Sequence, residues 1–207
     1  MLPAFFASVG SILVNATRII NTVVIAIKAI QVIANTIMAV CKELGLIENK
    51  DINVEELGSK ALAAEEEGIK PENFETYEAY VKEIEKFEVD PTKAESWSEE
   101  EKATRGTIVT TGLLLEKYGP VVADVIVELS KRPDFFTTDR VKLYLDLASD
   151  QQIDIQQISR YLNGDIKNFN ELRTINDVML EIETKLNPHL TTEEKQQNIN
   201  EQKAQQQ

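Results

Sequence analysis

The sequence predicts an all-α protein with one long apolar N-terminal helix, followed by an acidic multi-helix domain and a disordered glutamine-rich tail. Two observations support this prediction. Apolar residues recur at alternating steps of three and four through the first 46 residues, and helix caps alternate with helix stop signals through the rest of the chain. We divide the chain into an apolar heptad-patterned helix at 1–47, an acidic helical segment at 48–97, a C-terminal helical domain at 98–190 and a disordered tail at 191–207.

The overall composition is that of a folded protein. The chain has 207 residues, of which 43% are hydrophobic and 28% are charged. Its formal net charge is −13 and its pI is near 4.6. We therefore expect no nucleic-acid partner, because binding to phosphate requires a basic surface. The single cysteine, Cys41, excludes an intrachain disulfide and suits a reducing compartment.

The segment from Pro3 to Leu46 is the most apolar part of the chain. Between Gly10 and Gly45 it has no glycine or proline that would interrupt a helix. Its charged residues are Arg18, Lys28, Lys42 and Glu43. We do not expect a cleaved signal peptide, because no positively charged segment precedes the apolar run and the apolar pattern continues well past residue 16.

Within this segment, apolar positions follow an unbroken heptad spacing, which is the pattern of a helix that packs along a partner helix in a coiled coil. We interpret these positions as an assembly seam: Ile12, Ala16, Ile19, Val23, Ala26, Ile30, Ile33, Ile37, Val40 and Leu44. A polar stripe runs opposite the seam at steps of seven residues: Asn21, Lys28, Asn35 and Lys42. The predicted helix is therefore amphipathic. A β-strand is the alternative over residues 22–32, where alternation is partial, but the helical spacing extends over a much longer stretch.

The length of this helix limits how it is buried. A helix of about 43 residues is roughly 65 Å long, whereas a hydrocarbon core is about 30 Å thick and a compact chain of this size is about 40–45 Å across. The first option is packing against other copies or within a larger assembly. The second is an oligomeric membrane bundle that hides the polar stripes, with Lys28 near the bilayer centre. The third is a core helix within its own chain. An in-plane interfacial helix is disfavoured because the segment has few cations.

The sequence of the acidic segment predicts short helices with defined ends. From Glu48 to Lys102 there are 18 Asp and Glu against 7 Lys and Arg, so this part accounts for −11 of the net charge. We expect a helix from Asn53 to about Glu67, closed by Gly68, and a helix over Phe74–Val89, capped by Asn73. Pro91–Ser98 is predicted to be a linker, with Trp97 against the core.

The C-terminal half repeats the pattern of cap, helix and stop. Ser98 and Glu101 match a capping box for a helix that runs to about Tyr118, where Gly119 and Pro120 end it. The further helices that we expect are Val121–Ser130, Thr138–Leu147, Ile153–Leu162 and a last helix from Asn168 or Asn170 to Leu186. Phe135 and Phe136 are expected in the core, and Thr191–Gln207 is expected to be disordered.

No residue pattern predicts catalysis or a cofactor. His189 is the only histidine and follows Pro188 at a helix end, so the usual nucleophile–base arrangements lack a base. Cys41 falls on the apolar side of the first helix and is expected to pack as a small hydrophobe. Asp124 and Glu128 lie four residues apart, as an acid–base or metal pair could, but we interpret them as the solvated edge of a buried helix. We predict no enzyme activity, no cofactor, no bound metal and no small-molecule substrate.

The pattern favours a non-catalytic structural or assembly protein that packs through its N-terminal helix into a homo-oligomer or a larger particle, such as a virion or an injection machine. The acidic domain would then face solvent, and the protein would be cytoplasmic or part of a protein assembly. The alternative is a membrane-associated protein whose N-terminal helix inserts as an oligomeric bundle or pore. A third hypothesis is a monomeric binding module in which the long helix forms the core.

Overall fold

The computed structural model describes residues 9–26 and 30–204, and these residues form helices and connecting segments without a β-strand. The predicted all-α class is therefore confirmed. The elements are α1 (Val9–Ala26), α2 (Ile30–Glu43), α3 (Val54–Glu66), the 3-10 helix η1 (Pro71–Asn73), α4 (Tyr77–Lys86), α5 (Pro91–Ser96), α6 (Glu99–Tyr118), α7 (Val121–Lys131), α8 (Thr138–Ser149), α9 (Ile155–Leu162), α10 (Phe169–Leu186) and α11 (Thr192–Ala204).

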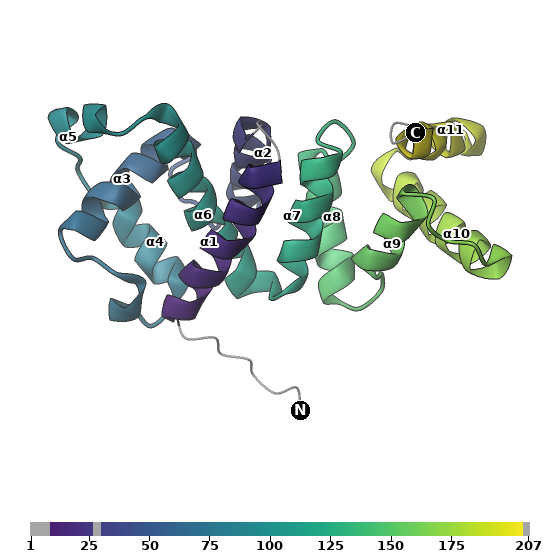
Figure 1. Ribbon diagram of the computed structural model, residues 1–207, viewed down its shortest axis with the longest axis horizontal. Helices are drawn as coiled ribbons and strands as arrows, with labels where there is room; N and C mark the ends of the chain where they lie inside the picture. Colours follow the sequence, from purple (N-terminus) through teal and green to yellow (C-terminus); the bar gives the residue numbers. More distant parts are fainter. Residues whose placement is uncertain (1–8, 27–29, 205–207) are drawn as a thin grey trace.

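Helix α6 is the centre of the first half of the molecule, where α1, α2, α3 and α4 all pack against it. Figure 1 shows this group at one end, the pair α7 and α8 beside it, and α9, α10 and α11 at the other end. From α6 to α10, the order of the helices in the chain is also their order along the long axis of the molecule, and α11 lies beside α10 at the far end.

The middle of α6 is buried on all sides, as a helix surrounded by other helices must be. Its threonines enter the core because each hydroxyl finds an acceptor within the same helix. Thr107 donates to the carbonyl of Ala103 at 2.6 Å, and Thr110 donates to the carbonyl of Gly106 at 3.0 Å. The polar groups are thus satisfied without solvent.

Helices α3 and α6 touch backbone to backbone, and glycine makes this contact possible. A Cβ on Gly58 would lie 1.8 Å from the carbonyl oxygen of Lys102, and a Cβ on Gly106 would lie 2.0 Å from the carbonyl oxygen of Val54. Neither position has room for a methyl group, because both neighbours are backbone atoms of a helix. The two glycines therefore fix how closely α3 approaches α6.

The N-terminal segment forms two helices where we predicted one. α1 packs against α6 and α7, and α2 packs against α6 and α8. Residues 1–8 and 27–29, which include Pro3 and Lys28, lie outside the described residues. A single helix of about 65 Å would extend past a domain of this size, whereas two shorter helices bury their apolar faces against the same central helix.

Several helix starts lie where the capping residues predicted them. The side chain of Asn53 accepts the amide of Glu56 at 2.7 Å and opens α3. Ser98 and Glu101 form the predicted capping box of α6: the amide of Glu101 donates to Ser98 Oγ at 3.2 Å, and the amide of Ser98 donates to Glu101 Oε2 at 2.8 Å. Asn168 caps α10 in the same manner. These starts are local events, and local sequence predicts them.

The second helix of the acidic segment begins later than predicted. We expected Asn73 to cap a helix over Phe74–Val89, but Asn73 ends η1, and α4 has Thr76 as its N-cap. The first two amides of α4 donate to the carboxylate of Glu116 on α6, at 2.6 and 2.9 Å. This tertiary contact selects the start of the helix, and a carboxylate at a helix N-terminus is also favoured by the helix dipole.

The predicted linker at Pro91–Ser98 is largely helical, because Pro91–Ser96 form α5. Proline occupies its first turn, and Asp90 caps it by accepting the amide of Thr92 at 2.8 Å. Trp97 is half-buried and does not belong to the buried core. The prediction of an unstructured linker was wrong because a proline after a capping aspartate begins a helix as readily as it breaks one.

The predicted disordered tail is also wrong for residues 192–204, which form α11. Thr191 and Glu194 form a reciprocal cap: the amide of Glu194 donates to Thr191 Oγ1 at 3.2 Å, and the amide of Thr191 donates to Glu194 Oε2 at 2.7 Å. Ile199, the one isoleucine between residues 191 and 207, is fully buried. The cap opens this polar helix, and Ile199 together with polar contacts to α9 and α10 holds it on its neighbours.

Candidate interaction surfaces

The assembly seam is buried within its own chain. Six seam residues are in the core, and three are partly buried; the burial of Ala26 is outside the description. The core residues are Ile12, Ala16, Val23, Ile33, Ile37 and Val40, and the partly buried ones are Ile19, Ile30 and Leu44. The apolar pattern thus packs α1 and α2 onto helices of the same molecule.

The polar stripe faces outward where the structure describes it. Asn21 and Asn35 are exposed, and Asn35 Oδ1 accepts a hydrogen bond from Gln31 at 3.3 Å. Lys42 is half-buried and donates to the carbonyl of Lys50 at 2.7 Å. Lys28 lies outside the described residues. The described stripe is a solvated helix edge.

Cys41 and His189, which were not predicted to form a catalytic pair, do not share a site in the structure. Cys41 is fully buried, and its thiol donates to the carbonyl of Thr110 at 3.4 Å. Burial raises the pKa of this thiol well above its ordinary value, so the reactive thiolate is suppressed. His189 is exposed in the connection between α10 and α11. The two side chains belong to different parts of the molecule.

Glu128 is buried and not solvated, which corrects our interpretation of the Asp124–Glu128 pair. Its side chain is paired with Arg132 at 2.7 Å and with Lys131 at 2.7 Å, and it accepts a hydrogen bond from Ser159 at 2.6 Å. Glu128 and Arg132 are 2% and 4% exposed. The carboxylate therefore joins α7 to α9. The i, i+4 spacing of Glu128 and Arg132 was the sequence signal for this pair, and we had compared Glu128 with Asp124 instead.

A second buried ion pair joins α8 to α10. Arg140 pairs with Glu183, whose carboxylate also accepts a hydrogen bond from Asn187 at 3.0 Å. The guanidinium of Arg140 lies over the ring of Phe135, 3.8 Å from its centroid. Phe135 is in the core, as predicted. The partners are 43 residues apart, and no local pattern marks them.

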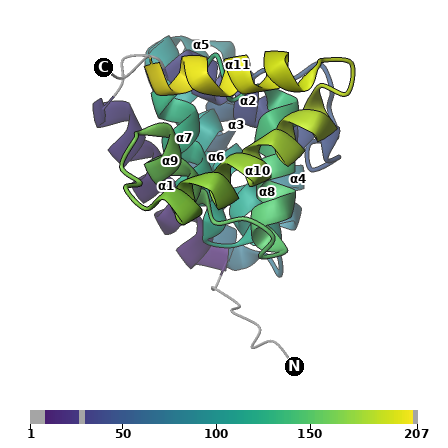
Figure 2. The same cartoon turned by 90° about the vertical axis from the view of Figure 1, so that its right-hand side faces the viewer.

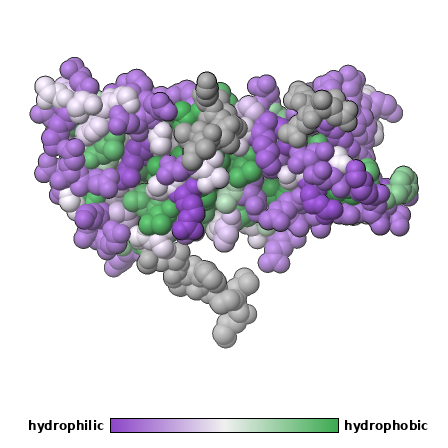
Figure 3. All heavy atoms as spheres, viewed as in Figure 1, coloured by the Kyte–Doolittle hydropathy of each residue, from purple (hydrophilic) through white to green (hydrophobic). Residues whose placement is uncertain are grey.

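The largest exposed apolar side chains of α10 lie at its N-terminal end. Phe169 is 77% exposed and Leu172, one turn later, is 36% exposed. Val14 on α1 and Val32 on α2 are the other large exposed apolar residues among those described. Figure 3 shows hydrophilic residues over most of one face, with hydrophobic residues in small separate areas. We call Phe169 and Leu172 the α10 tip.

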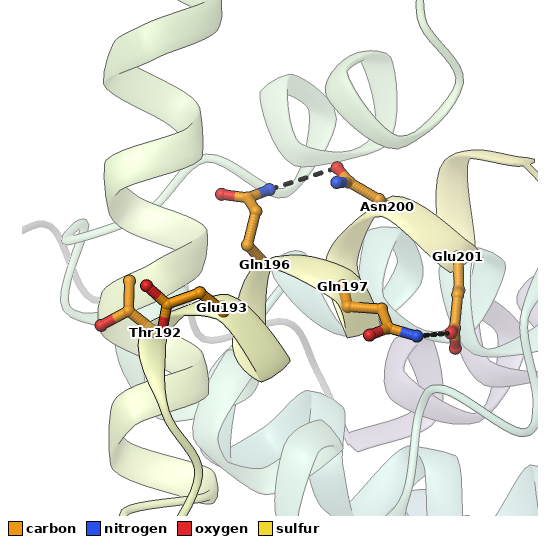
Figure 4. A pocket seen from close by; sticks show the side chains of 6 residues that line it. All are labelled: Thr192, Glu193, Gln196, Gln197, Asn200 and Glu201. Atoms are coloured by element: carbon orange, nitrogen blue, oxygen red, sulfur yellow. Dashed lines mark hydrogen bonds between the residues drawn. The ribbon is translucent and has the colours of Figure 1, made fainter.

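Figure 4 shows a hollow whose whole lining comes from α11: Thr192, Glu193, Gln196, Gln197, Asn200 and Glu201. Gln196 donates to Asn200 at 3.2 Å, and Gln197 donates to Glu201 at 3.0 Å. Because a single helix supplies every lining residue, this hollow is the outer polar side of α11 and does not enclose a ligand.

A smaller hollow of about 450 Å³ lies between α3 and the segment after α4. Lys60 lines it and donates to the carbonyls of Glu85 and Phe87 at 3.0 and 2.9 Å. Glu85 lies in the last turn of α4 and Phe87 directly follows the helix. A cation at the C-terminal end of a helix is favourable, because it bonds the free carbonyls and complements the helix dipole. The ammonium group of Lys60 thus stabilises the C-terminal end of α4 against α3.

None of the helices in the described part of the chain combines the length and apolar character needed to cross a membrane. Within residues 9–26 and 30–204, no group of three or more His, Cys, Asp and Glu side chains is placed to hold a metal ion.

Comparisons with known proteins give no relative. The chain matches no protein-family model, no curated protein and no solved structure.

Proposed function

We propose that this chain is a non-catalytic structural protein that self-associates, alone or within a larger assembly, through the α10 tip. The observation behind this proposal is the 77% exposure of Phe169. Exposed aromatic side chains that a partner surrounds are the usual anchors of protein interfaces. Leu172 extends the apolar surface by one turn of the same helix.

The α10 tip is held in place before any partner arrives. Asn168 caps the helix by accepting the amides of Asn170 and Glu171 at 2.9 and 3.1 Å. Glu171 in turn forms an ion pair with Arg160 of α9 at 3.1 Å. A rigid anchor loses little conformational entropy on binding, and this favours association.

The charge around the α10 tip favours a second copy of the chain as the partner. Residues 160–177 contain three basic and three acidic side chains, whereas the whole chain has a net charge of −13. The charged residues are Arg160, Asp165, Lys167, Glu171, Arg173 and Asp177. Copies of an acidic protein repel one another least through a surface that is locally neutral and mixed in sign.

This proposal places the contact at α10 and not at the N-terminal seam, because the seam residues with described burial pack inside the same chain. The remaining seam position, Ala26, has no described burial.

The test is the mass of the protein in solution as a function of concentration, by sedimentation equilibrium. We expect the mass of the wild type to rise above the 23.3 kDa of one chain as concentration increases. The double variant Phe169→Ser/Leu172→Ser is expected to remain monomeric. Val14→Ser is the matched control, because Val14 is also apolar and 59% exposed but lies on α1. A wild type that stays at the mass of one chain at every concentration contradicts the proposal.

A further inference from the structure

Helix α11 is attached to the rest of the molecule mainly by polar contacts. Asn176 of α10 and Gln196 of α11 exchange two amide hydrogen bonds, at 3.0 and 3.1 Å. Lys203 lies over the ring of Tyr161 on α9, 3.5 Å from its centroid. The one fully buried apolar side chain that α11 contributes is Ile199.

This attachment is weak for a helix of its length. The 13 residues of α11 are close to the minimum of about 12–15 at which even favourable isolated helices form in water. The sequence is polar, so its helical state depends on the contacts to α9 and α10. Segments with few buried apolar contacts open more easily than the core.

Helix α11 lies at the edge of the fold, so that its departure exposes only the part of the core that Ile199 covers. Figure 2 shows α11 along the upper edge of the outer end of the molecule, where α10 also lies. It packs against α9 and α10. The connection from α10 is short, residues 187–191, and contains Pro188 and one turn in which the amide of Leu190 donates to the carbonyl of Asn187 at 3.2 Å.

We infer that α11 exchanges between two copies of the chain, so that the α11 of each copy occupies the α9–α10 surface of the other. The occupant of the α9–α10 surface is α11 of the second copy, because α11 already packs on that surface within one chain. The same contacts would then form between chains: the burial of Ile199, the hydrogen bonds of Asn176 with Gln196 and the contact of Lys203 with Tyr161. This inference rests on the self-association proposed above and specifies how the copies join.

Three features favour exchange over a simple surface contact. A reciprocal exchange is closed by a twofold axis, so it stops at a dimer. The connection between α10 and α11 is only residues 187–191, and short hinge loops are known to promote swapping. The α10 tip belongs to the helix that receives α11, so both contacts lie at the same end of the molecule.

The experiment places one thiol on each side of the contact, in different chains. A full-length chain with Asn176→Cys and a second full-length chain with Gln196→Cys are co-expressed with different tags and purified through both tags in succession. A short bismaleimide is then added, and the products are separated on a denaturing gel. We expect a covalent pair that contains both tags.

The controls separate the possible failures. The double variant Asn176→Cys/Gln196→Cys in one chain, at low concentration, is expected to crosslink within the chain, which confirms that the reagent spans the two positions. Asn176→Cys co-expressed with Glu95→Cys, a distant exposed position, measures random collisions. The wild type, treated in the same way, shows that the buried Cys41 does not react.

Each result has a distinct meaning. One outcome is that a complex is purified through both tags but crosslinks between positions 176 and 196 no more than the collision control does. This outcome overturns the exchange and leaves the proposed self-association standing. If no complex carrying both tags is recovered, self-association itself is contradicted. As a second test, a four-residue Gly-Ser insertion after His189 is expected to shift the exchanged dimer toward monomer, because a longer hinge lets α11 return to its own chain. An unchanged mass contradicts the exchange.

Discussion

Arg140 on α8 and Glu183 on α10 form an ion pair whose side chains are 8% and 0% exposed, so both charges are removed from water and depend on each other. Together with Glu128 and Arg132, which join α7 to α9, this pair fixes the C-terminal helices to the rest of the fold. Charged residues in this half of the molecule thus act as structural links between helices.

Removing one partner of the buried pair should therefore be costly. We expect Glu183→Gln to lower the free energy of unfolding by about 3–5 kcal/mol, because it leaves the guanidinium of Arg140 buried without a counter-charge. Urea denaturation measures this change. The double variant Arg140→Met/Glu183→Leu is expected to recover much of the loss, since it removes both charges. Lys185→Gln, which breaks the exposed pair with Glu181, is the control and should cost less than about 1 kcal/mol.

The close approach of α3 and α6 predicts a strong effect from a single methyl group. Gly106→Ala places a Cβ 2.0 Å from the carbonyl oxygen of Val54, so the two helices must separate. We expect a loss of about 1–3 kcal/mol or more in unfolding free energy. The matched control is Gly10→Ala on α1, where the new methyl group meets only the flexible side chain of Glu72. If both substitutions have the same effect, the backbone contact is not what fixes the two helices.

The capping box of α6 predicts a specific pH dependence. The hydrogen bonds from Ser98 hold the pKa of Glu101 below its ordinary value of 4.5. A lowered pKa in the folded state means that the carboxylate stabilises the fold above its unfolded pKa and loses this contribution as the pH falls through the folded pKa. The difference in melting temperature between the wild type and Glu101→Ala should therefore shrink as the pH is lowered from about 7 to about 3. Glu100→Ala is the control, because it removes a carboxylate from the same first turn that has no part in the capping box; equal trends in the two variants would contradict the prediction.

Burial of Cys41 makes its thiol a reporter of unfolding. The thiol is fully buried and its pKa is raised, so modification by a thiol reagent requires the core to open. We expect no reaction with the native protein on the time scale at which free cysteine reacts, and complete reaction in denaturant. Glu183→Gln should accelerate the reaction about tenfold for each 1.4 kcal/mol that it removes from the free energy of unfolding, if modification follows global opening. Rapid modification of the native wild type would show that this part of the core opens locally.

The sequence alone was sufficient where structure depends on neighbours in the chain. The caps of Asn53, Ser98 and Asn168 were predicted because each side chain bonds an amide two or three residues ahead. The start of α4 was not, because Glu116 reaches it from another helix. Local patterns describe helix ends well and tertiary partners poorly.

The same limit applies to the candidate surfaces. The heptad spacing predicted correctly which side of α1 and α2 is apolar, but a seam looks the same whether its partner is another copy or another helix of the same chain. The sequence pattern did not predict that Phe169 is exposed either, because large aromatic residues are usually buried for most of their surface. Only the folded arrangement shows that Phe169 is left uncovered.

The central place of α6 has a consequence for synthesis. The ribosome makes α1 and α2 before α6, and α6, against which both pack, ends at Tyr118, about 90 residues after the end of α1. At roughly 5–20 residues per second, their apolar faces wait several seconds for a partner. During that interval the nascent chain exposes the apolar faces of α1 and α2, which are buried in the folded protein. A chaperone or a neighbouring nascent chain can bind these faces then, but not after folding is complete.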